Sequence, residues 1–213
     1  TLAFEFAELG WGVIFASRQM TPENAYQRIV LSGPKEKEPE EIAAGLDGPV
    51  DLLVVDTYEW QARLEQRCRR WANKILVIDD LANRKHDCDV LMDQTLGRSD
   101  EDYASLTPSG ARLMMGVDYA LIRREFRNQR SEALARRNEP VKKILVSIGG
   151  TDTENLVERI LTGIAEAGLD VVVDLAISDA TSNLESIREL IAKLGKKYRL
   201  HLNADNMAQL MKH

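Results

Sequence analysis

The sequence predicts an α/β protein of two lobes, in which helices cover parallel sheets. Short apolar runs alternate with amphipathic helical stretches along the chain. The runs, such as Leu52–Val55 and Ile144–Ile148, are continuous rather than alternating in polarity. Such strands are buried on both faces, which is typical of parallel sheets between helices. A highly charged stretch interrupts the pattern after Arg123, and the alternation then restarts.

The first lobe is expected to begin with a helix, because Leu2, Phe6 and Leu9 share one helical face and Gly10 follows as a stop signal. Apolar runs and helical spacing then place the remaining elements of this lobe. They are strands at Val13–Ala16, Leu52–Val55, Ile75–Ile78, Val90–Met92 and Leu113–Met115, and helices over Pro39–Leu46 and Trp60–Trp71.

The second lobe repeats the alternation after a connector rich in arginine. Its expected elements are strands at Ile144–Ile148, Val171–Ile177 and Arg199–Leu202, helices over Glu154–Ala167 and Leu184–Leu194, and a helix beginning within Asp205–His213 with Asp205 as N-cap. We therefore divide the chain into an N-terminal domain over residues 1–122, a charged linker or exposed helix over 123–140, and a C-terminal domain over 141–213.

Composition excludes several classes of protein. The chain has 213 residues, a net charge of −6 and 44% hydrophobic residues. An acidic balance disfavours a nucleic-acid surface, and the apolar runs fall far short of the ~20 residues that span a bilayer. Two cysteines cannot build a disulfide scaffold and favour a reducing compartment. We expect a cytoplasmic protein that binds neither nucleic acid nor membrane.

A glycine-rich turn is the strongest local signal for a ligand. An apolar strand runs into Gly149 and Gly150, and then Thr151 and Asp152 precede a helix. Glycines allow close approach to the backbone, and the N–H groups at a helix start attract anions such as a diphosphate. An ordinary strand-to-helix turn has the same composition. Asp152 would repel an adjacent phosphate, which favours a capping role or contact with a sugar hydroxyl.

Two further candidates follow strands of the first lobe. Asp56 and Tyr58 come directly after one strand, where α/β proteins form their sites; a structural, helix-capping role is the favoured interpretation for Asp56. Asp79 and Asp80 follow the next strand and should point to opposite faces. We expect one of them to brace a loop while the other faces the cleft.

The segment from His86 to Asp89 contains residue types that bind metals. Its spacing is too tight for a usual zinc site, and no second cluster of Cys and His completes one. We expect no metal, and favour a packed Cys88 beside a hydrogen-bonded His86.

Several segments spread over most of the chain form a specific series by their order and spacing. The segments are Asp56–Tyr58, Asp79–Arg84, His86–Asp89, Tyr119–Phe126, and Gly149–Asp152 followed by Asn155 and Leu156. Together they resemble the family of UDP-2,4-diacetamido-2,4,6-trideoxy-β-L-altropyranose hydrolases of pseudaminic acid synthesis. The resemblance also extends to related spore-coat polysaccharide proteins and, more distantly, to the GT-B glycosyltransferase that adds N-acetylglucosamine to lipid I.

The resemblance implies two Rossmann-like domains of GT-B type with a cleft between them, in which water displaces UDP at the anomeric carbon without metal or other cofactor. The sugar would then be bound by residues of one group, namely Tyr58, Asp80, Tyr119 and Arg123. The nucleotide would be held by a second group, namely Gly149, Gly150, Thr151 and Asp152. Thr57 departs from the family pattern, since some members carry His there.

The resemblance implies that the general base is a histidine in a Gly-x-Gly-His-x-x-Arg loop that should precede Thr1, so we expect the catalytic base to lie outside this sequence. We assign that role to none of His86, His201 and His213. Because the chain starts and stops within helices, we expect the first strand and loop to be missing and the C-terminal domain to be truncated. Residues 1–213 alone should be inactive.

Two alternatives to a UDP-sugar hydrolase stay open. One is a GT-B glycosyltransferase that uses a UDP-amino sugar. The other is a nucleotide-sugar-binding fragment without activity. In each case we expect a monomer whose partner is the UDP-sugar.

Overall fold

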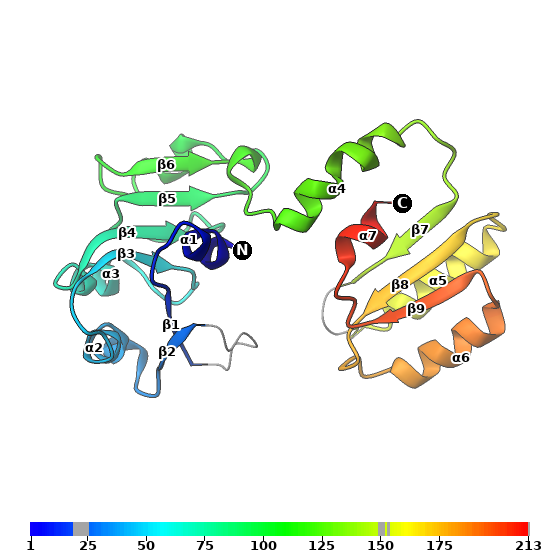
Figure 1. Ribbon diagram of the computed structural model, residues 1–213, viewed down its shortest axis with the longest axis horizontal. Helices are drawn as coiled ribbons and strands as arrows, with labels where there is room; N and C mark the ends of the chain where they lie inside the picture. The colour runs from blue at the N-terminus through cyan, green and yellow to red at the C-terminus, as the bar shows by residue number, and fades with distance from the viewer. Residues whose placement is uncertain (19–25, 149–151, 153, 213) are drawn as a thin grey trace. The chain divides into compact units, whose positions relative to one another are not determined.

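The computed structural model describes residues 1–18, 26–148, 152 and 154–212, and shows a mixed α/β protein with parallel sheets. Every strand pair in the described residues is parallel, which confirms the predicted class of fold. The contacts divide the chain into two compact units, Thr1–Leu121 and Ile122–His213. Figure 1 shows the helices and strands of each unit.

The first unit is built on a four-stranded sheet in the order β3-β4-β5-β6, and a separate pair joins β1 to β2. In Figure 1 the arrowheads of β3 to β6 point to one edge. The elements are α1 (Leu2–Glu8), β1 (Ile14–Ser17), β2 (Gln27–Val30), α2 (Glu38–Ala44), β3 (Val50–Val55), α3 (Ala62–Cys68), β4 (Ala72–Ile78), β5 (Val90–Asp93) and β6 (Arg112–Met115), with short 3-10 turns at Lys35–Lys37, Asp100–Tyr103 and Val117–Tyr119.

Strand β2 was not predicted from the sequence. It begins with Gln27 and Arg28, so it has no continuous apolar run, and only Ile29 of its four residues is buried. Its pairing with β1, rather than its composition, makes it a strand.

The core of the first unit lies between the sheet and helices α2 and α3. It joins Trp60, Leu64, Ile75 and Leu91, among others, into one cluster. Cys68 and Cys88 are also members and are free thiols, 0% and 2% exposed. Burial raises the pKa of both thiols to about 12, so they are packing residues rather than nucleophiles.

The second unit has a three-stranded sheet in the order β7-β8-β9. Side chains of α5 and α6 pack on one face of it, with Leu161 and Ile187 fully buried among the strand residues Val146, Val173 and Leu175. The elements are α4 (Arg124–Ala135), β7 (Lys143–Val146), α5 (Leu156–Glu166), β8 (Val172–Ile177), α6 (Leu184–Leu194), β9 (Tyr198–Leu202) and α7 (Met207–Met211).

The charged stretch and the last helix both lie in this unit. Helix α4 occupies most of the stretch interpreted as a linker, and Lys212 forms an ion pair with its Glu132 at 2.8 Å. Helix α7 is capped by Asn206, whose side chain accepts from the N–H of Gln209, and not by Asp205 as predicted. Asp205 stands one residue too early to reach the first free N–H groups of the helix.

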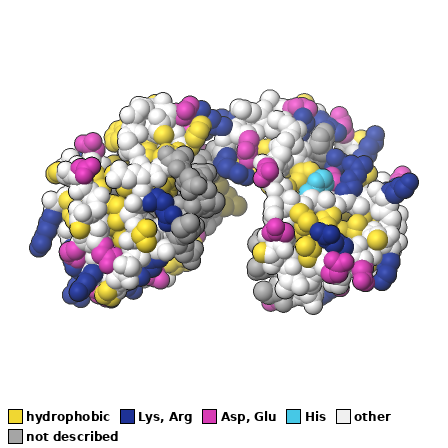
Figure 2. Space-filling view, turned by 60° about the horizontal axis from the view of Figure 1, so that its bottom comes forward, with side chains coloured by type: hydrophobic (Ala, Val, Ile, Leu, Met, Phe, Trp, Pro, Cys, Tyr) yellow, Lys and Arg dark blue, Asp and Glu magenta, His cyan; other side chains and the backbone are white. Residues whose placement is uncertain are grey.

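Charged side chains are spread over the surface. Figure 2 shows acidic and basic side chains interspersed on the visible face of both units. Among the residues that the structure describes, every helix is too short or too polar to cross a bilayer.

Candidate functional site

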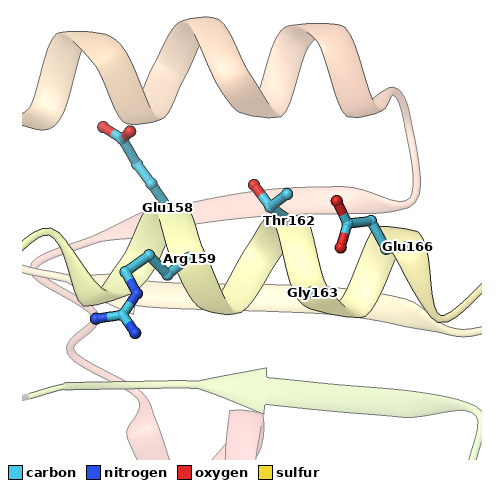
Figure 3. Close-up of a pocket in the computed structure, with 5 residues that line it drawn as sticks. All are labelled: Glu158, Arg159, Thr162, Gly163 and Glu166. Atoms are coloured by element: carbon cyan, nitrogen blue, oxygen red, sulfur yellow. The ribbon is translucent and has the colours of Figure 1, made fainter.

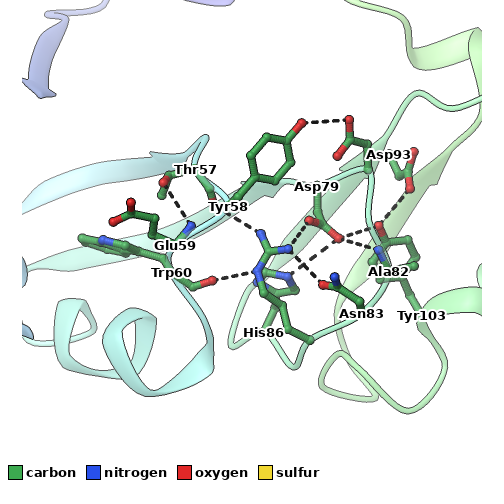
Figure 4. Close-up of polar contacts among 12 residues, drawn as sticks. Thr57, Tyr58, Glu59, Trp60, Asp79, Ala82, Asn83, His86, Asp93 and Tyr103 are labelled. Atoms are coloured by element: carbon green, nitrogen blue, oxygen red, sulfur yellow. Dashed lines mark hydrogen bonds and ion pairs between the residues drawn. The ribbon is translucent and has the colours of Figure 1, made fainter. Parts of the chain in front are cut away.

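The carboxyl edge of the first sheet gathers polar residues from three loops. Because β3, β4 and β5 are parallel and paired in register, the residues that follow them emerge at one edge. These residues are Asp56–Tyr58 after β3, Asp79 and Asp80 after β4, and Asp93 with Gln94 at the end of β5. Figure 4 shows the side chains from these loops converging.

Tyr58 and Asp80, two of the predicted sugar-binding residues, contact each other. The Tyr58 hydroxyl donates to Asp80 Oδ2 at 3.1 Å. The Tyr58 side chain is 64% exposed, so the pair faces solvent. The hydrogen bond to Asp80, followed by the charge of that carboxylate, raises the pKa of Tyr58. The edge thus offers a phenol and a carboxylate side by side, a combination that can bind sugar hydroxyl and amide groups.

Asp79 points the other way, as predicted for one of the two neighbouring aspartates. Its side chain is fully buried, and its Oδ2 accepts from the N–H of Ala82 at 3.0 Å and from the hydroxyl of Tyr103 at 2.8 Å. Burial alone would raise the pKa of this carboxyl, but those two hydrogen bonds and the charge of Arg84 lower it. Asp79 therefore braces the loop below the exposed pair.

Tyr103 lies between two buried carboxylates. Its hydroxyl is 2.8 Å from Oδ2 of both Asp79 and Asp93, and the residue is 0% exposed. Burial, then hydrogen bonding to the two carboxylates, raises the pKa of the phenol. The neutral phenol therefore links the loop after β4 to the end of β5, as Figure 4 shows.

Two arginines neutralise these carboxylates. Arg84 forms an ion pair with Asp79 at 2.7 Å, and Arg98 forms one with Asp93. Both arginine side chains are mostly buried, at 13% and 18% exposure. Buried charges need such partners, because desolvation without pairing is costly.

His86 and Cys88 are packed as expected. His86 is 4% exposed and its Nδ1 lies 2.8 Å from Glu65 Oε1, while the N–H of Asp87 donates to Glu65 Oε2 at 2.6 Å. Within the described residues, no group of three or more His, Cys, Asp or Glu side chains is arranged to hold a metal ion.

The two remaining sugar-side candidates belong to different units. Tyr119 ends the 3-10 turn that follows β6, after Gly116, which has a φ of 85°. Arg123 lies in the second unit, where it pairs with Glu125 at 3.0 Å and covers the ring of Phe126 at 5.1 Å. The structure therefore brings Tyr58 and Asp80 together, and describes Arg123 only within its own unit.

Asp152 is the one described member of the predicted nucleotide-binding turn, since Gly149, Gly150 and Thr151 lie outside the described residues. It is 3% exposed. Its Oδ1 accepts from the N–H of Leu156 at 2.7 Å, and its Oδ2 accepts from the N–H of Val157 and from Asn183 Nδ2, both at 3.2 Å. This is the capping role considered for it, and its contact with a nucleotide stays a prediction.

A hollow of about 370 Å³ runs along helix α5 of the second unit. Figure 3 shows Glu158, Thr162 and Glu166 along the helix, with Arg159 on another side. None of the predicted site residues lines this hollow. Glu158 already accepts from Ser186 Oγ, and two carboxylates beside one arginine do not suit a diphosphate.

Sequence reasoning did not single out the residues that hold the carboxyl edge together. Arg84 stood within a motif segment, but its partners lie on the loop after β3 as well as on its own loop after β4. Tyr103 and Arg98 sit in an irregular stretch with no periodic signal. The one signal that the sequence offers is an aromatic residue, Tyr103, directly after the polar residues 98–102.

The fold and this cluster define a class of protein, a parallel α/β protein. In its first sheet, polar side chains gather at the carboxyl ends of the strands and are held there by buried ion pairs. Comparison with known proteins then places the chain near a UDP-sugar enzyme. It is 30% identical over 162 residues to the UDP-2,4-diacetamido-2,4,6-trideoxy-β-L-altropyranose hydrolase of Campylobacter jejuni, covering 76% of this chain and 56% of that protein. This confirms the resemblance inferred from the motifs.

A second relative is an uncharacterised protein, MJ1062, of Methanocaldococcus jannaschii. It is 23% identical over 168 residues, which cover 76% of this chain and 34% of that protein. The chain thus spans about half the length of the Campylobacter relative and a third of the archaeal one. No family model matches the sequence.

Proposed function

We propose that the protein is a hydrolase that releases UDP from a UDP-linked 2,4-diacetamido-2,4,6-trideoxy sugar in nonulosonic (pseudaminic) acid biosynthesis. The observation that carries the proposal is the 30% identity, over three quarters of this chain, to a hydrolase of that substrate. The braced carboxyl edge supports it, because Tyr58 and Asp80 offer polar groups to a sugar where α/β proteins bind ligands.

In the proposed reaction, water attacks the anomeric carbon and the bond from that carbon to the diphosphate oxygen breaks. The bonding electrons leave with UDP, and a general base accepts the proton of the water. By the resemblance, that base is the histidine of the family's Gly-x-Gly-His-x-x-Arg loop. Tyr58, Asp80, Tyr119 and Arg123 orient the sugar.

The proposal includes a GT-B arrangement, with domains at 1–122 and 141–213 joined by 123–140 and a cleft between the domains. The turn at Gly149, Gly150 and Thr151 binds the diphosphate through backbone N–H groups. Asp152 supports this turn by fixing the start of α5 through the N–H groups of Leu156 and Val157. A helix held at its first turn presents its remaining N–H groups in a fixed direction.

The test is UDP release from the diacetamido sugar nucleotide by the full-length protein, followed with and without candidate acceptors. Release in water alone supports hydrolysis, whereas release that needs an acceptor identifies a transferase. Binding of UDP without any release would leave only the binding function.

Tyr58→Phe removes one hydroxyl from the proposed sugar site and should lower kcat/KM about tenfold, the worth of one hydrogen bond. Tyr198→Phe is the matched control. Tyr198 is the first residue of β9 and so lies at the opposite end of its strand from the carboxyl edge. Equal losses in both variants would contradict a sugar-side role for Tyr58.

A further inference from the structure

We propose that Arg84 and Arg98 are positioning residues that clamp the loops after β3 and β4, and thereby hold Tyr58 against Asp80. The inference deepens the proposed function, because it assigns the groups that orient its sugar-binding pair. It depends on contacts within the first unit only.

Arg84 donates hydrogen bonds to the backbone on either side of Tyr58, within the loop after β3. Its Nη2 donates to the carbonyl oxygen of Thr57 at 3.2 Å, and its Nε donates to the carbonyl oxygen of Trp60 at 2.8 Å. Tyr58 and Glu59 lie between these two carbonyls. The indole of Trp60 is itself buried, and its Nε1 donates to the buried Glu38, so the Trp60 end of the loop is anchored in the core.

The third contact of Arg84 connects that loop to the next one. Its Nη1 pairs with Asp79 Oδ1 at 2.7 Å, and Asp79 directly precedes Asp80. Asp79 is fixed in turn by Tyr103 and by the N–H of Ala82, a residue with a φ of 48°. A non-glycine residue keeps such a conformation only where its surroundings enforce it.

Arg98 connects the backbone of Asp80 to the end of β5. Its Nη2 donates to the carbonyl oxygen of Asp80 at 2.7 Å, and its Nε bonds the buried Asp93. The guanidinium also lies 5.9 Å from the ring centre of Tyr103. The contacts form a closed path from Tyr58 through Asp80, Asp79 and Arg84 back to the Tyr58 loop, with Arg98 as a second anchor.

This arrangement requires the guanidinium fork. Arg84 forms an ion pair with Asp79 while it donates to two backbone carbonyls, and Arg98 donates to Asp93 and to one backbone carbonyl. A planar group with five donors can reach such partners at the same time. A lysine keeps the charge beside the carboxylate but has a single ammonium on a flexible stem. Replacement by lysine therefore removes the clamp with the least change in charge.

The first test follows Tyr58 directly. Protein labelled with [¹³Cζ]tyrosine shows signals from five tyrosines, and the Tyr58 signal is assigned by its loss in Tyr58→Phe. In Arg84→Lys and Arg98→Lys the Tyr58 pKa should fall towards its ordinary value of about 10, because the hydrogen bond to Asp80 is what raises it. Arg70→Lys, at an exposed position of the same unit, should leave the titration as in the wild type.

The second test is catalytic. In the full-length protein, kcat/KM for UDP release should fall by up to about 100-fold in Arg84→Lys, since a misplacement of about 1 Å has that effect. Emission from Trp11, Trp60 and Trp71, which lie in the first unit, reports whether that unit is folded in each variant. If Arg84→Lys fails to fold, Arg98→Lys provides the same readout.

A folded variant whose Tyr58 titrates as in the wild type overturns the clamp. This outcome is separate from failure of the proposed function. If the wild type releases no UDP from the sugar nucleotide, hydrolysis is wrong, while the Tyr58 titration still decides the role of the arginines.

Discussion

The carboxylate of Asp89 joins three parts of the first unit at the start of β5. Its Oδ1 accepts from Lys74 Nζ at 2.8 Å, its Oδ2 accepts from the N–H of Ile75 at 2.9 Å, and Arg69 pairs with it from the end of α3. Burial alone would raise the pKa of this carboxyl, but the hydrogen bonds from Lys74, Arg69 and Ile75 lower it to about 2.

The lowered pKa predicts how stability depends on pH. A carboxyl with a depressed pKa in the folded state stabilises the protein above its unfolded-state pKa, near 3.8, and this contribution disappears as pH falls to about 2. Asp89→Asn should therefore lower the free energy of unfolding of the first unit by ~2 kcal/mol at pH 7. The difference from the wild type should shrink between about pH 4 and pH 2.

Urea unfolding followed by tryptophan emission measures this difference at each pH. Asp51→Asn, at an exposed position of β3, is the control and should show no such convergence. A wild-type advantage that stays constant down to pH 2 would show that the Asp89 charge does not contribute.

The role of a single side chain could be predicted from the sequence only where the adjacent residues in the chain determine it. The opposite directions of Asp79 and Asp80 follow from the period of an extended chain, and the structure confirms that one of them braces a loop. Arg84 contacts Thr57 and Trp60 across 27 and 24 residues of the chain, and Tyr103 contacts Asp79 across 24. These contacts are set by tertiary packing between loops, and no local pattern encodes them.

The start of helix α5 is capped by a side chain that precedes its N-cap residue. Its N-cap residue, Asn155, has a φ of 52° and makes no capping hydrogen bond with its side chain. Asp152 supplies the acceptors instead, to the N–H groups of Leu156 and Val157. A buried carboxylate at a helix start satisfies free N–H groups and interacts favourably with the helix dipole.

Asp152→Ala should therefore destabilise the second unit by about 1–2 kcal/mol. The first unit should be unaffected. Circular dichroism at 222 nm during urea unfolding follows the helices, and tryptophan emission follows the first unit separately. Asp205→Ala is the matched control, because Asp205 is exposed and does not cap α7; equal destabilisation by both changes would rule out the capping role.

Most elements could be predicted from apolar runs and helical spacing, to within a few residues at their ends. Helix α6 was predicted with its observed bounds, Leu184–Leu194, because its apolar positions recur at helical intervals. Strand β2 could not be predicted, since a strand with one buried residue has no pattern of its own and depends on its neighbour β1.

The two units have separate hydrophobic cores. The cluster around Ile75 and Leu91 lies in the first unit, and the cluster around Leu161 and Ile187 lies in the second. Each core is closed by its own helices and sheet. The two-lobed organisation predicted from the restart of the alternation near Arg123 is compatible with this division, while the GT-B arrangement stays a proposal.

Leu161→Ala should destabilise the second unit by about 2–5 kcal/mol, since it removes a fully buried side chain and leaves a cavity. The unfolding transition seen by tryptophan emission should keep its midpoint, because all three tryptophans lie in the first unit. The helical signal should lose its second-unit component at lower urea concentration. A matching shift of the emission midpoint would show that the units unfold together.

Alkylation of the buried thiols of the first unit can report how often its core opens. Cys68 and Cys88 are enclosed in the core, with pKa values of about 12, so an alkylating reagent at neutral pH meets neither a thiolate nor an accessible sulfur. When the core opens, the sulfur atoms become accessible and the thiols are no longer held in the protonated form by burial. The rate at which iodoacetamide adds mass to the protein therefore counts opening events of the sheet that carries Tyr58 and Asp80, and a ligand bound at that edge should slow the labelling.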